Sequence, residues 1–279
     1  MNDAPRRIWL CADDYGLSDG VNRAIRDLIE RGRLNATSVM MVAPAIGRDA
    51  AAALQASVTK NPRCAIGLHV TLTAPFRPLT LHFRPLDGDM FMPFPKLLRA
   101  GMLRRLDAEL VHAEVLAQLD AFRELFGRVP DYVDGHQHAQ LFPQVRDGFL
   151  RAVKERAPEA WVRQGGLNLP LTQRITGFKT LVLDVLSTQF RSKAARLGLR
   201  FNPTFAGAYD FTTEPDFGPL MAQFLKGLPE GGLVMCHPGF VDETLKSLDP
   251  LTTQRENEHA YLASDDFPAL LTLNNVTLG

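Results

Sequence analysis

The first apolar run of the chain reads Ile8-Trp9-Leu10-Cys11 and continues as Ala12-Asp13-Asp14-Tyr15-Gly16-Leu17-Ser18. Neighbouring carboxylates repel each other unless a cation or a proton lies between them. An acidic pair at the end of a strand therefore indicates a metal site or a general base with an adjusted pKa. Acidic residues also cap helices, and Ser18-Asp19 would suit the N-cap of a following helix. The pair alone leaves both interpretations open.

Two later apolar runs end in histidine. Cys64-Ala65-Ile66-Gly67-Leu68-His69-Val70-Thr71-Leu72-Thr73 carries His69, and Asp131-Tyr132-Val133-Asp134-Gly135-His136-Gln137-His138 carries His136 and His138. A single histidine beside a strand is commonly a hydrogen-bonded core residue. Two imidazoles and one carboxylate on three separate elements, however, match the facial arrangement that holds a divalent ion and leaves positions open for water and substrate.

Short apolar runs alternate with amphipathic segments along the chain, which is typical of βα units around a parallel sheet. The predicted strands are 8–11, 37–42, the runs into His69 and His136, 161–163, 199–201 and 232–236; the predicted helices are 21–29, 50–58, 107–126, one from Pro143, 171–197 and 216–227. Roughly seven or eight units favour a closed or nearly closed barrel over an open doubly wound sheet. We therefore predict an α/β fold: a single-domain (β/α) barrel over residues 1–279, similar to a TIM barrel but distorted or incomplete, with its active site at the C-terminal ends of the strands.

Residues 74–95 interrupt this alternation with five prolines and four phenylalanines. A long irregular segment directly after a predicted ligand strand is usually functional or mobile. We predict a lid or wall over the metal, in which Phe76 could stack on an apolar face of the substrate and Arg77 could meet an acidic group of the substrate. A loop held on the outside of the barrel by its own aromatic rings is an equal alternative.

Composition excludes several classes of protein. The chain has 279 residues, of which 46% are hydrophobic, so one large core is expected. Lys plus Arg and Asp plus Glu both number 31, which leaves no net field to attract nucleic acid or an anionic membrane. The run after Arg6-Arg7 is too brief for a signal peptide, and no stretch approaches the ~20 apolar residues of a membrane span. A cytoplasmic protein is expected by elimination.

The three cysteines lie inside apolar runs and form no Cys-x-x-Cys pair. They are Cys11, Cys64 and Cys236. We expect buried thiols, which are inert because burial raises the thiol pKa. A thiolate ligand or nucleophile is the minor alternative for Cys11 and Cys236, which are close in sequence to Asp13 and His237.

Four motifs give the chain a family resemblance: Asp13-Asp14-Tyr15-Gly16-Leu17-Ser18, Gly67-Leu68-His69-Val70-Thr71-Leu72-Thr73, Val133-Asp134-Gly135-His136-Gln137-His138 and Cys236-His237-Pro238-Gly239. In this order they resemble the motifs of the YdjC-like carbohydrate deacetylases, which include chito-oligosaccharide deacetylases and deacetylases of hopanoid biosynthesis. The resemblance extends from residue 8 to Arg255-Glu256-Asn257-Glu258. It implies a barrel-like α/β fold.

The resemblance also implies roles for individual residues. Asp14, His69 and His136 would bind one divalent metal ion, Mg²⁺ or Zn²⁺, Asp13 would be the catalytic base, and His237 the candidate acid. Relatives tend to have a further histidine where this chain has Gln140, so His138 is left as a substrate contact, a support for the metal ligands or an alternative ligand. Without the family pattern, His237-Pro238-Gly239 would be interpreted as a turn after a strand.

The implied activity is that of a metal-dependent hydrolase acting on a linear amide C–N bond, which removes acetyl from an N-acetylglucosamine-containing oligosaccharide or glycolipid. Such a site must activate water, stabilise an oxyanion and protonate the departing amine. Two alternatives remain: another metal hydrolase such as a phosphoesterase, and a non-catalytic carbohydrate-binding relative. A homodimer is expected from analogy only.

Overall fold

The computed structural model describes residues 4–166, 178–211 and 213–278. The chain forms two compact units that alternate along the sequence. The first unit comprises Met1–Ser38, Pro44–Ala65 and Pro203–Gly279, and the second comprises Val39–Ala43 and Ile66–Asn202. The prediction of a single domain over residues 1–279 stays a prediction.

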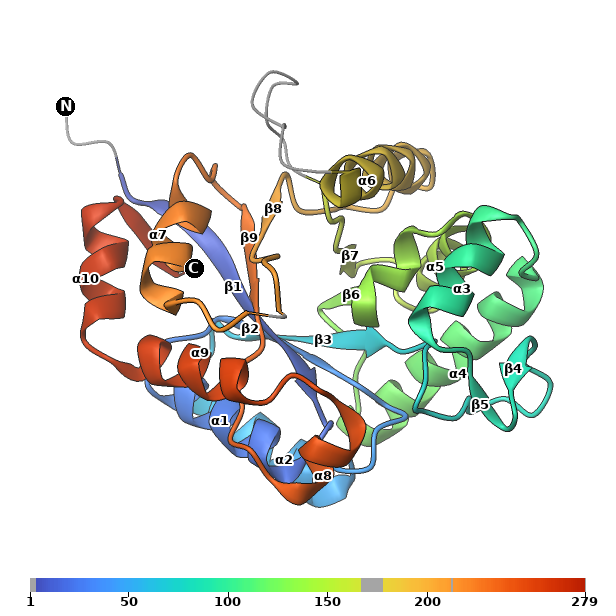
Figure 1. The fold of residues 1–279 in the computed structure, drawn as a ribbon, viewed down its shortest axis with the longest axis horizontal. Coiled ribbons are helices and arrows are strands. Elements are labelled where there is room, and N and C mark those ends of the chain that lie inside the picture. Colours follow the sequence, from blue (N-terminus) through green and yellow to red (C-terminus); the bar gives the residue numbers. More distant parts are fainter. Residues whose placement is uncertain (1–3, 167–177, 212, 279) are drawn as a thin grey trace. The chain divides into compact units, whose positions relative to one another are not determined.

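The described strands form one large sheet and one small pair (Figure 1). The order of the large sheet is β7-β6-β3-β2-β1-β9-β8, and β10 pairs with β1 beside this path. Its strands are β1 (Arg6–Tyr15), β2 (Ala36–Val39), β3 (Ala65–Val70), β6 (Tyr132–Gly135), β7 (Trp161–Val162), β8 (Phe205–Ala206), β9 (Leu233–Cys236) and β10 (Val276–Leu278). The pair consists of β4 (Leu86–Asp87) and β5 (Met90–Phe91), which are antiparallel.

Helices connect the strands in the manner of βα units. The described helices are α1 (Asp19–Glu30), α2 (Arg48–Lys60), α3 (Phe94–Met102), α4 (Ala108–Phe126), η1 (His136–Leu141), α5 (Pro143–Arg156), α6 (Phe178–Arg196), α7 (Phe217–Leu225), α8 (Glu243–Leu248), α9 (Thr253–Ala263) and α10 (Asp266–Leu273). None of the helices in the described ranges is both long and apolar enough to cross a membrane.

In the first unit, the sequence explains why β1 is followed directly by α1. Residues 10–15 of β1 are buried without interruption, as in parallel strands covered on both faces. Ser18 is the N-cap of α1, and its side chain accepts a hydrogen bond from the backbone N–H of Val21. The apolar stripe of α1 is buried, and the helix packs against α2 and α9. The carboxyl end of β1 is thereby fixed at the start of a capped helix.

In the second unit, β3 and β6 pair in parallel and are followed by the packed helices α4 and α5 (Figure 1). A side chain at Gly67 would meet the ring of Tyr132 at 2.5 Å, so only glycine fits beneath that ring. Tyr132 in turn stacks on Trp161, with ring centroids 4.3 Å apart. This close packing sets the position of His69, two residues after Gly67.

The structure confirms the predicted α/β fold with a parallel sheet. The sheet path has two ends, β7 and β8, which corresponds to the incomplete form of the predicted (β/α) barrel. Helix 107–126 is found at Ala108–Phe126 with Asp107 as its N-cap, and Pro143 opens α5 as expected. The part of the predicted helix 171–197 that falls on residues 171–177 lies outside the described residues.

Three parts of the chain differ from the sequence prediction. The run 199–201 is not a strand: only Phe201 forms an isolated bridge, with Val162, and β8 lies further along at Phe205–Ala206. The segment 74–95 is less irregular than expected, because it contains the β4–β5 pair and the first turn of α3. The elements α8, α9, α10 and β10 were not predicted. α8 and β10 are short, and the apolar residues of α9 gather at its C-terminal end instead of recurring along the helix.

Candidate active site

In the first unit, the register of β1 and β9 brings Asp13 and His237 to the same end of the sheet. Ala12 lies opposite Cys236, so Asp13 and His237 occupy the next position on each strand. His237 Nε2 is 4.0 Å from Asp13 Oδ2, and Asp13 is only 2% exposed. The predicted base and the predicted acid are therefore neighbours.

Asp13 also has two polar neighbours on its other oxygen. The Cys11 thiol and the Ser38 hydroxyl each lie 3.4 Å from Asp13 Oδ1. All three cysteines are free and buried, as predicted. Neither the thiol nor the hydroxyl is a charged donor.

Asp14 is held by a buried arginine that follows it by 241 positions. Arg255 Nη2 donates to Asp14 Oδ2 at 2.6 Å and to Asp249 Oδ2 at 2.7 Å. Asp14 and Arg255 are each 1% exposed. Asp14 is a non-glycine residue with a φ of 70°, in the left-handed region that aspartate tolerates better than most residues.

His237 is held through its backbone by Glu258 of α9. The His237 N–H donates to Glu258 Oε2, and the Tyr209 hydroxyl donates to Oε1 at 2.7 Å. The ring of Phe211 meets the imidazole edge to face at a centroid distance of 5.3 Å. The imidazole thus lies between an aromatic wall and the carboxylate of Asp13.

Burial shifts the pKa values of the groups around His237. Burial lowers the pKa of His237 to about 4, although Asp14 and Asp13 oppose this effect. Burial raises the pKa of Glu258 to about 7, against the hydrogen bonds from Tyr209 and the His237 backbone. Burial and the neighbouring Glu258 also raise the pKa of Tyr209 above its ordinary value. The imidazole is therefore neutral at pH 7 in the metal-free protein.

In the second unit, the register of β3 and β6 pairs His69 with Asp134. His69 Nδ1 lies 2.6 Å from Asp134 Oδ1, and Arg163 Nη1 lies 3.1 Å from Asp134 Oδ2. All three residues are buried. A carboxylate on one ring nitrogen orients a ligating histidine and raises its basicity, so a metal would be held through Nε2 of His69.

His136 follows β6 immediately and opens η1. Its ring meets the ring of His69 at a centroid distance of 5.4 Å and that of Phe76 at 6.2 Å, edge to face in both cases. Gln140 is buried and donates to the Arg163 carbonyl at 3.2 Å. A side chain at Gly135 would meet Gln140 Oε1 at 2.6 Å. Gln140 therefore supports the turn that presents His136.

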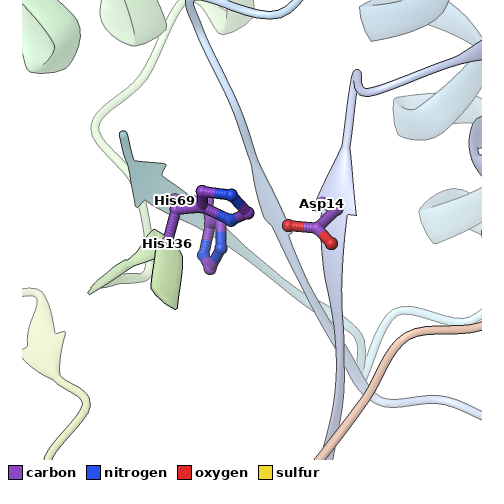
Figure 2. Close-up of side chains that lie close together, drawn as sticks. All are labelled: Asp14, His69 and His136. Atoms are coloured by element: carbon purple, nitrogen blue, oxygen red, sulfur yellow. The ribbon is translucent and has the colours of Figure 1, made fainter. Parts of the chain in front are cut away.

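Asp14, His69 and His136 form a group of candidate metal ligands (Figure 2). Each offers one ligand atom, and these atoms all lie within 4.8 Å of one another. One carboxylate and two imidazoles are a ligand set that zinc, iron and other divalent ions accept. The His69–Asp134 pair adds the supporting carboxylate that such sites usually have. The residues present therefore fit a divalent ion.

The loop after β3 is fastened to α4 by two buried side chains. Glu114 accepts hydrogen bonds from the backbone N–H groups of Leu79 and Thr80, at 3.0 and 2.9 Å. Gln118 bonds to both the N–H and the carbonyl of Thr71. Phe76 lies between these anchors and is itself buried, so its contact with His136 is well supported.

The three predicted substrate contacts occupy different environments. Phe76 is 4% exposed and packs on His136. Arg77 is exposed and forms an ion pair with Asp89 at 2.7 Å. His138 lies in η1 with a φ of 56°. Their roles in substrate binding, and the role of segment 74–95 as a lid or wall, stay predictions.

Several residues around the site received no role from the sequence. Asp134 stood inside a quoted motif, and its register opposite His69 could have been foreseen from the pairing of parallel strands. Arg255 and Glu258 stood at the C-terminal limit of the resemblance, three residues apart, which places them on one face of a helix. Arg163, Asp249 and Tyr209 have no local pattern that distinguishes them from surface residues.

Curated relatives support the resemblance noted in the sequence. A chitooligosaccharide deacetylase of Yersinia pestis (strain Pestoides F) is 30% identical over 238 residues, which cover 84% of this chain and 82% of the relative. The protein of the same name from Yersinia pseudotuberculosis serotype O:3 (strain YPIII) matches equally well.

Two crystal structures share the fold. One is a protein of Enterococcus faecalis V583 provisionally named as a cellobiose-phosphate cleavage protein; its TM-score is 0.75 at 19% identity, over 99% of this chain and 97% of that one. The other is the lactam utilization protein of Thermus thermophilus, with a TM-score of 0.53 at 17% identity over 98% of both chains. At these identities they show the fold alone. The model of the YdjC-like protein family matches residues 7–272, and the chain therefore belongs to this family.

Proposed function

We propose that this protein is a metal-dependent hydrolase that removes the acetyl group from an N-acetylated amino sugar. The observation that carries the proposal is the group of Asp14, His69 and His136, with Asp13 directly before Asp14. The names of the Yersinia relatives supply the substrate class, a chitooligosaccharide. An oligosaccharide or glycolipid that contains N-acetylglucosamine is therefore the substrate we propose.

Asp14, His69 and His136 would hold one divalent ion, Mg²⁺ or Zn²⁺. When bound, such an ion lowers the pKa of water and polarises an amide carbonyl. Asp13 is buried and directly precedes Asp14 in the chain, and it would accept the proton of the attacking water. A carboxylate that takes a proton during the reaction must be unprotonated beforehand.

His237 would deliver a proton to the departing amine. Because its pKa is lowered to about 4, the imidazole is neutral at pH 7 and must receive a proton before it can donate one. Asp13 Oδ2 lies 4.0 Å from Nε2, and Asp13 would pass on the proton taken from water once the two groups approach to hydrogen-bond distance. The backbone hydrogen bond to Glu258 and the ring of Phe211 hold the imidazole in this position.

A cytoplasmic location and a homodimer are further parts of the proposal. Both come from the sequence and the resemblance, and each has a simple test. Fractionation of cells would locate the protein, and light scattering would give its mass in solution.

The proposal is tested by acetate release from N-acetylglucosamine compounds, from the monosaccharide to oligomers and lipid-linked forms. Metal-loaded and chelator-treated protein are compared, and release is expected only from the loaded protein. Asp13→Asn should lower kcat about 10²–10⁴-fold, the usual contribution of a general base, while metal affinity measured by calorimetry stays near that of the wild type. Asp120→Asn on the surface of α4, which pairs with Arg156, is the matched control and should leave kcat unchanged.

Two results would contradict the proposal. If protein shown to contain metal releases acetate from none of the compounds, it is another metal hydrolase, such as a phosphoesterase, or a binding protein. Unchanged acetate release by Asp13→Asn would remove Asp13 from the reaction.

A further inference from the structure

Arg255 is among the largest fully buried side chains in the described part of the chain, and its position is unusual for a cation. A single nitrogen, Nη2, donates to two carboxylates, those of Asp14 and Asp249. The other terminal nitrogen, Nη1, is buried without a hydrogen-bond partner among the described residues. The position of the guanidinium therefore leaves one of its nitrogens without an acceptor. The two carboxylates determine this position.

The Nε atom and the backbone carbonyl of Arg255 also form hydrogen bonds with nearby residues. Its Nε donates to the Leu251 carbonyl at 3.1 Å, and its backbone carbonyl accepts from the Gly239 N–H at 3.1 Å. Gly239 follows His237 by two residues, so the same helix end is tied to the loop of the candidate acid. These contacts make Arg255 a rigid support, because both its backbone and the root of its guanidinium are fixed.

Asp14 needs such a support because its backbone is in the left-handed region. The turn that holds it there is closed by the Leu17 N–H, which donates to the Asp14 carbonyl at 3.0 Å, and by the Gly16 N–H, which donates to Asn22 Oδ1 at 2.6 Å. A carboxylate on a turn can still rotate about its side-chain bonds. Arg255 removes that freedom by binding one of its two oxygens.

Stability alone is a poor explanation for this arrangement. Removing charges from water costs several kcal/mol per ion, so buried ion pairs often contribute little to folding. The cluster of Asp14, Asp249 and Arg255 has one more acidic group than basic, so the arginine leaves negative charge uncompensated. Burial lowers the pKa of Arg255, but the two carboxylates outweigh this effect and raise it above its ordinary value. The arginine therefore stays charged and the site still favours a cation.

We infer that Arg255 is a positioning residue for Asp14: it binds Oδ2 and thereby fixes the direction in which the other carboxylate oxygen is presented to a metal ion. Asp249 accepts a hydrogen bond from the same nitrogen and so helps to hold the guanidinium. This inference rests on the metal site of the proposed function. It assigns a function to α9, an element that carries none of the predicted metal ligands.

The test is calorimetric titration of the metal-free protein with Zn²⁺ and with Mn²⁺. Arg255→Lys keeps the charge but loses the Nε contact with Leu251, so Kd for the metal should rise about 10–100-fold, as for other residues that support metal ligands. Arg146→Lys is the matched control: Arg146 is also buried and donates to Gln189, and its Kd should equal that of the wild type. Circular dichroism and Tm report whether each variant is folded.

A second variant keeps the inference testable if Arg255→Lys does not fold. Asp249→Asn leaves Arg255 in place but weakens its anchor, and Kd should rise about threefold, the effect of a contact worth a fraction of a kcal/mol. A folded Arg255→Lys protein, or in its absence a folded Asp249→Asn protein, with the wild-type Kd would overturn the inference and leave the proposed function intact. A wild-type protein that binds neither metal would overturn the proposed function and the inference together.

Discussion

Two clusters of buried and half-buried charges support the candidate ligands, one in each unit, and the supporting charges have opposite signs. The Asp14 triad consists of Asp14, Arg255 and Asp249, and an anionic ligand is held by a cation. The His69 triad consists of His69, Asp134 and Arg163, and a neutral ligand is held by an anion. Both triads fix the orientation of a ligand. Only the second also makes its ligand a better electron donor, because a carboxylate raises the basicity of imidazole and a guanidinium lowers that of a carboxylate.

The comparison predicts that the His69 triad has the larger effect on metal binding. Asp134→Asn keeps an acceptor for His69 Nδ1 but removes the negative charge, so orientation survives and basicity is lost. We expect Kd for Zn²⁺ to rise about 10–100-fold, toward the upper end of that range, measured by the same titration as for Arg255→Lys. An Asp134→Asn protein that binds Zn²⁺ as well as the wild type would show that charge on the supporting group is unimportant. The difference between the two triads would then be geometric only.

The groups beside the Asp14 triad make the stability of the metal-free protein depend on pH. The pKa of Glu258 is about 7 in the folded state and near 4.5 in the unfolded state, so the folded state binds more protons between these values. Its stabilising contribution is therefore present below pH ~4.5 and is lost as the pH rises through about 7. His237 acts in the opposite direction, since its pKa falls from 6.5 to about 4: its contribution is present above pH 6.5 and is lost as the pH falls through about 4.

Glu258→Gln should remove the pH dependence of stability that comes from Glu258 and leave the one that comes from His237. Between pH 5 and 6.5 the free energy of unfolding should then rise with pH more steeply than in the wild type, by up to ~1.4 kcal/mol per pH unit. Urea denaturation in the presence of a chelator measures this slope. Glu256→Gln, on the exposed face of the same helix, is the matched control and should follow the wild-type curve. Parallel curves for wild type and Glu258→Gln would show that Glu258 is ionised throughout this range.

The smallest effect is expected outside both triads, at Arg77. Its ion pair with Asp89 is exposed on both sides and contributes about 0–1 kcal/mol, so Arg77→Ala should leave Tm nearly unchanged. If Arg77 contacts the substrate, KM for an acidic or oligomeric substrate should rise about fivefold, the value of one hydrogen bond of ~1 kcal/mol, with kcat unchanged. Asp89→Ala removes the same ion pair and keeps Arg77, so its KM should be that of the wild type. Equal KM values for both variants would remove Arg77 from the substrate site.

The residues of the candidate site that lie at the ends of strands could be predicted from the sequence. Asp13, His69, His136 and His237 all stand at or just after buried apolar runs, and parallel strands place such positions at one edge of a sheet. The supporting residues could not be predicted in this way. Arg255 and Asp249 belong to a region with a weak apolar pattern, and a buried arginine is identified only by the partners that neutralise it. Those partners are set by tertiary packing, 241 positions apart in the case of Asp14.

The discontinuous first unit has a consequence for the order of events on the ribosome. Asp14 is made early, but Arg255 follows only 241 residues later, a delay of about 10–50 s at ordinary rates of synthesis. The second unit, including His69, Asp134 and Arg163, is complete in sequence by residue 202. A nascent chain can therefore form the histidine half of the site while Asp14 still lacks its arginine.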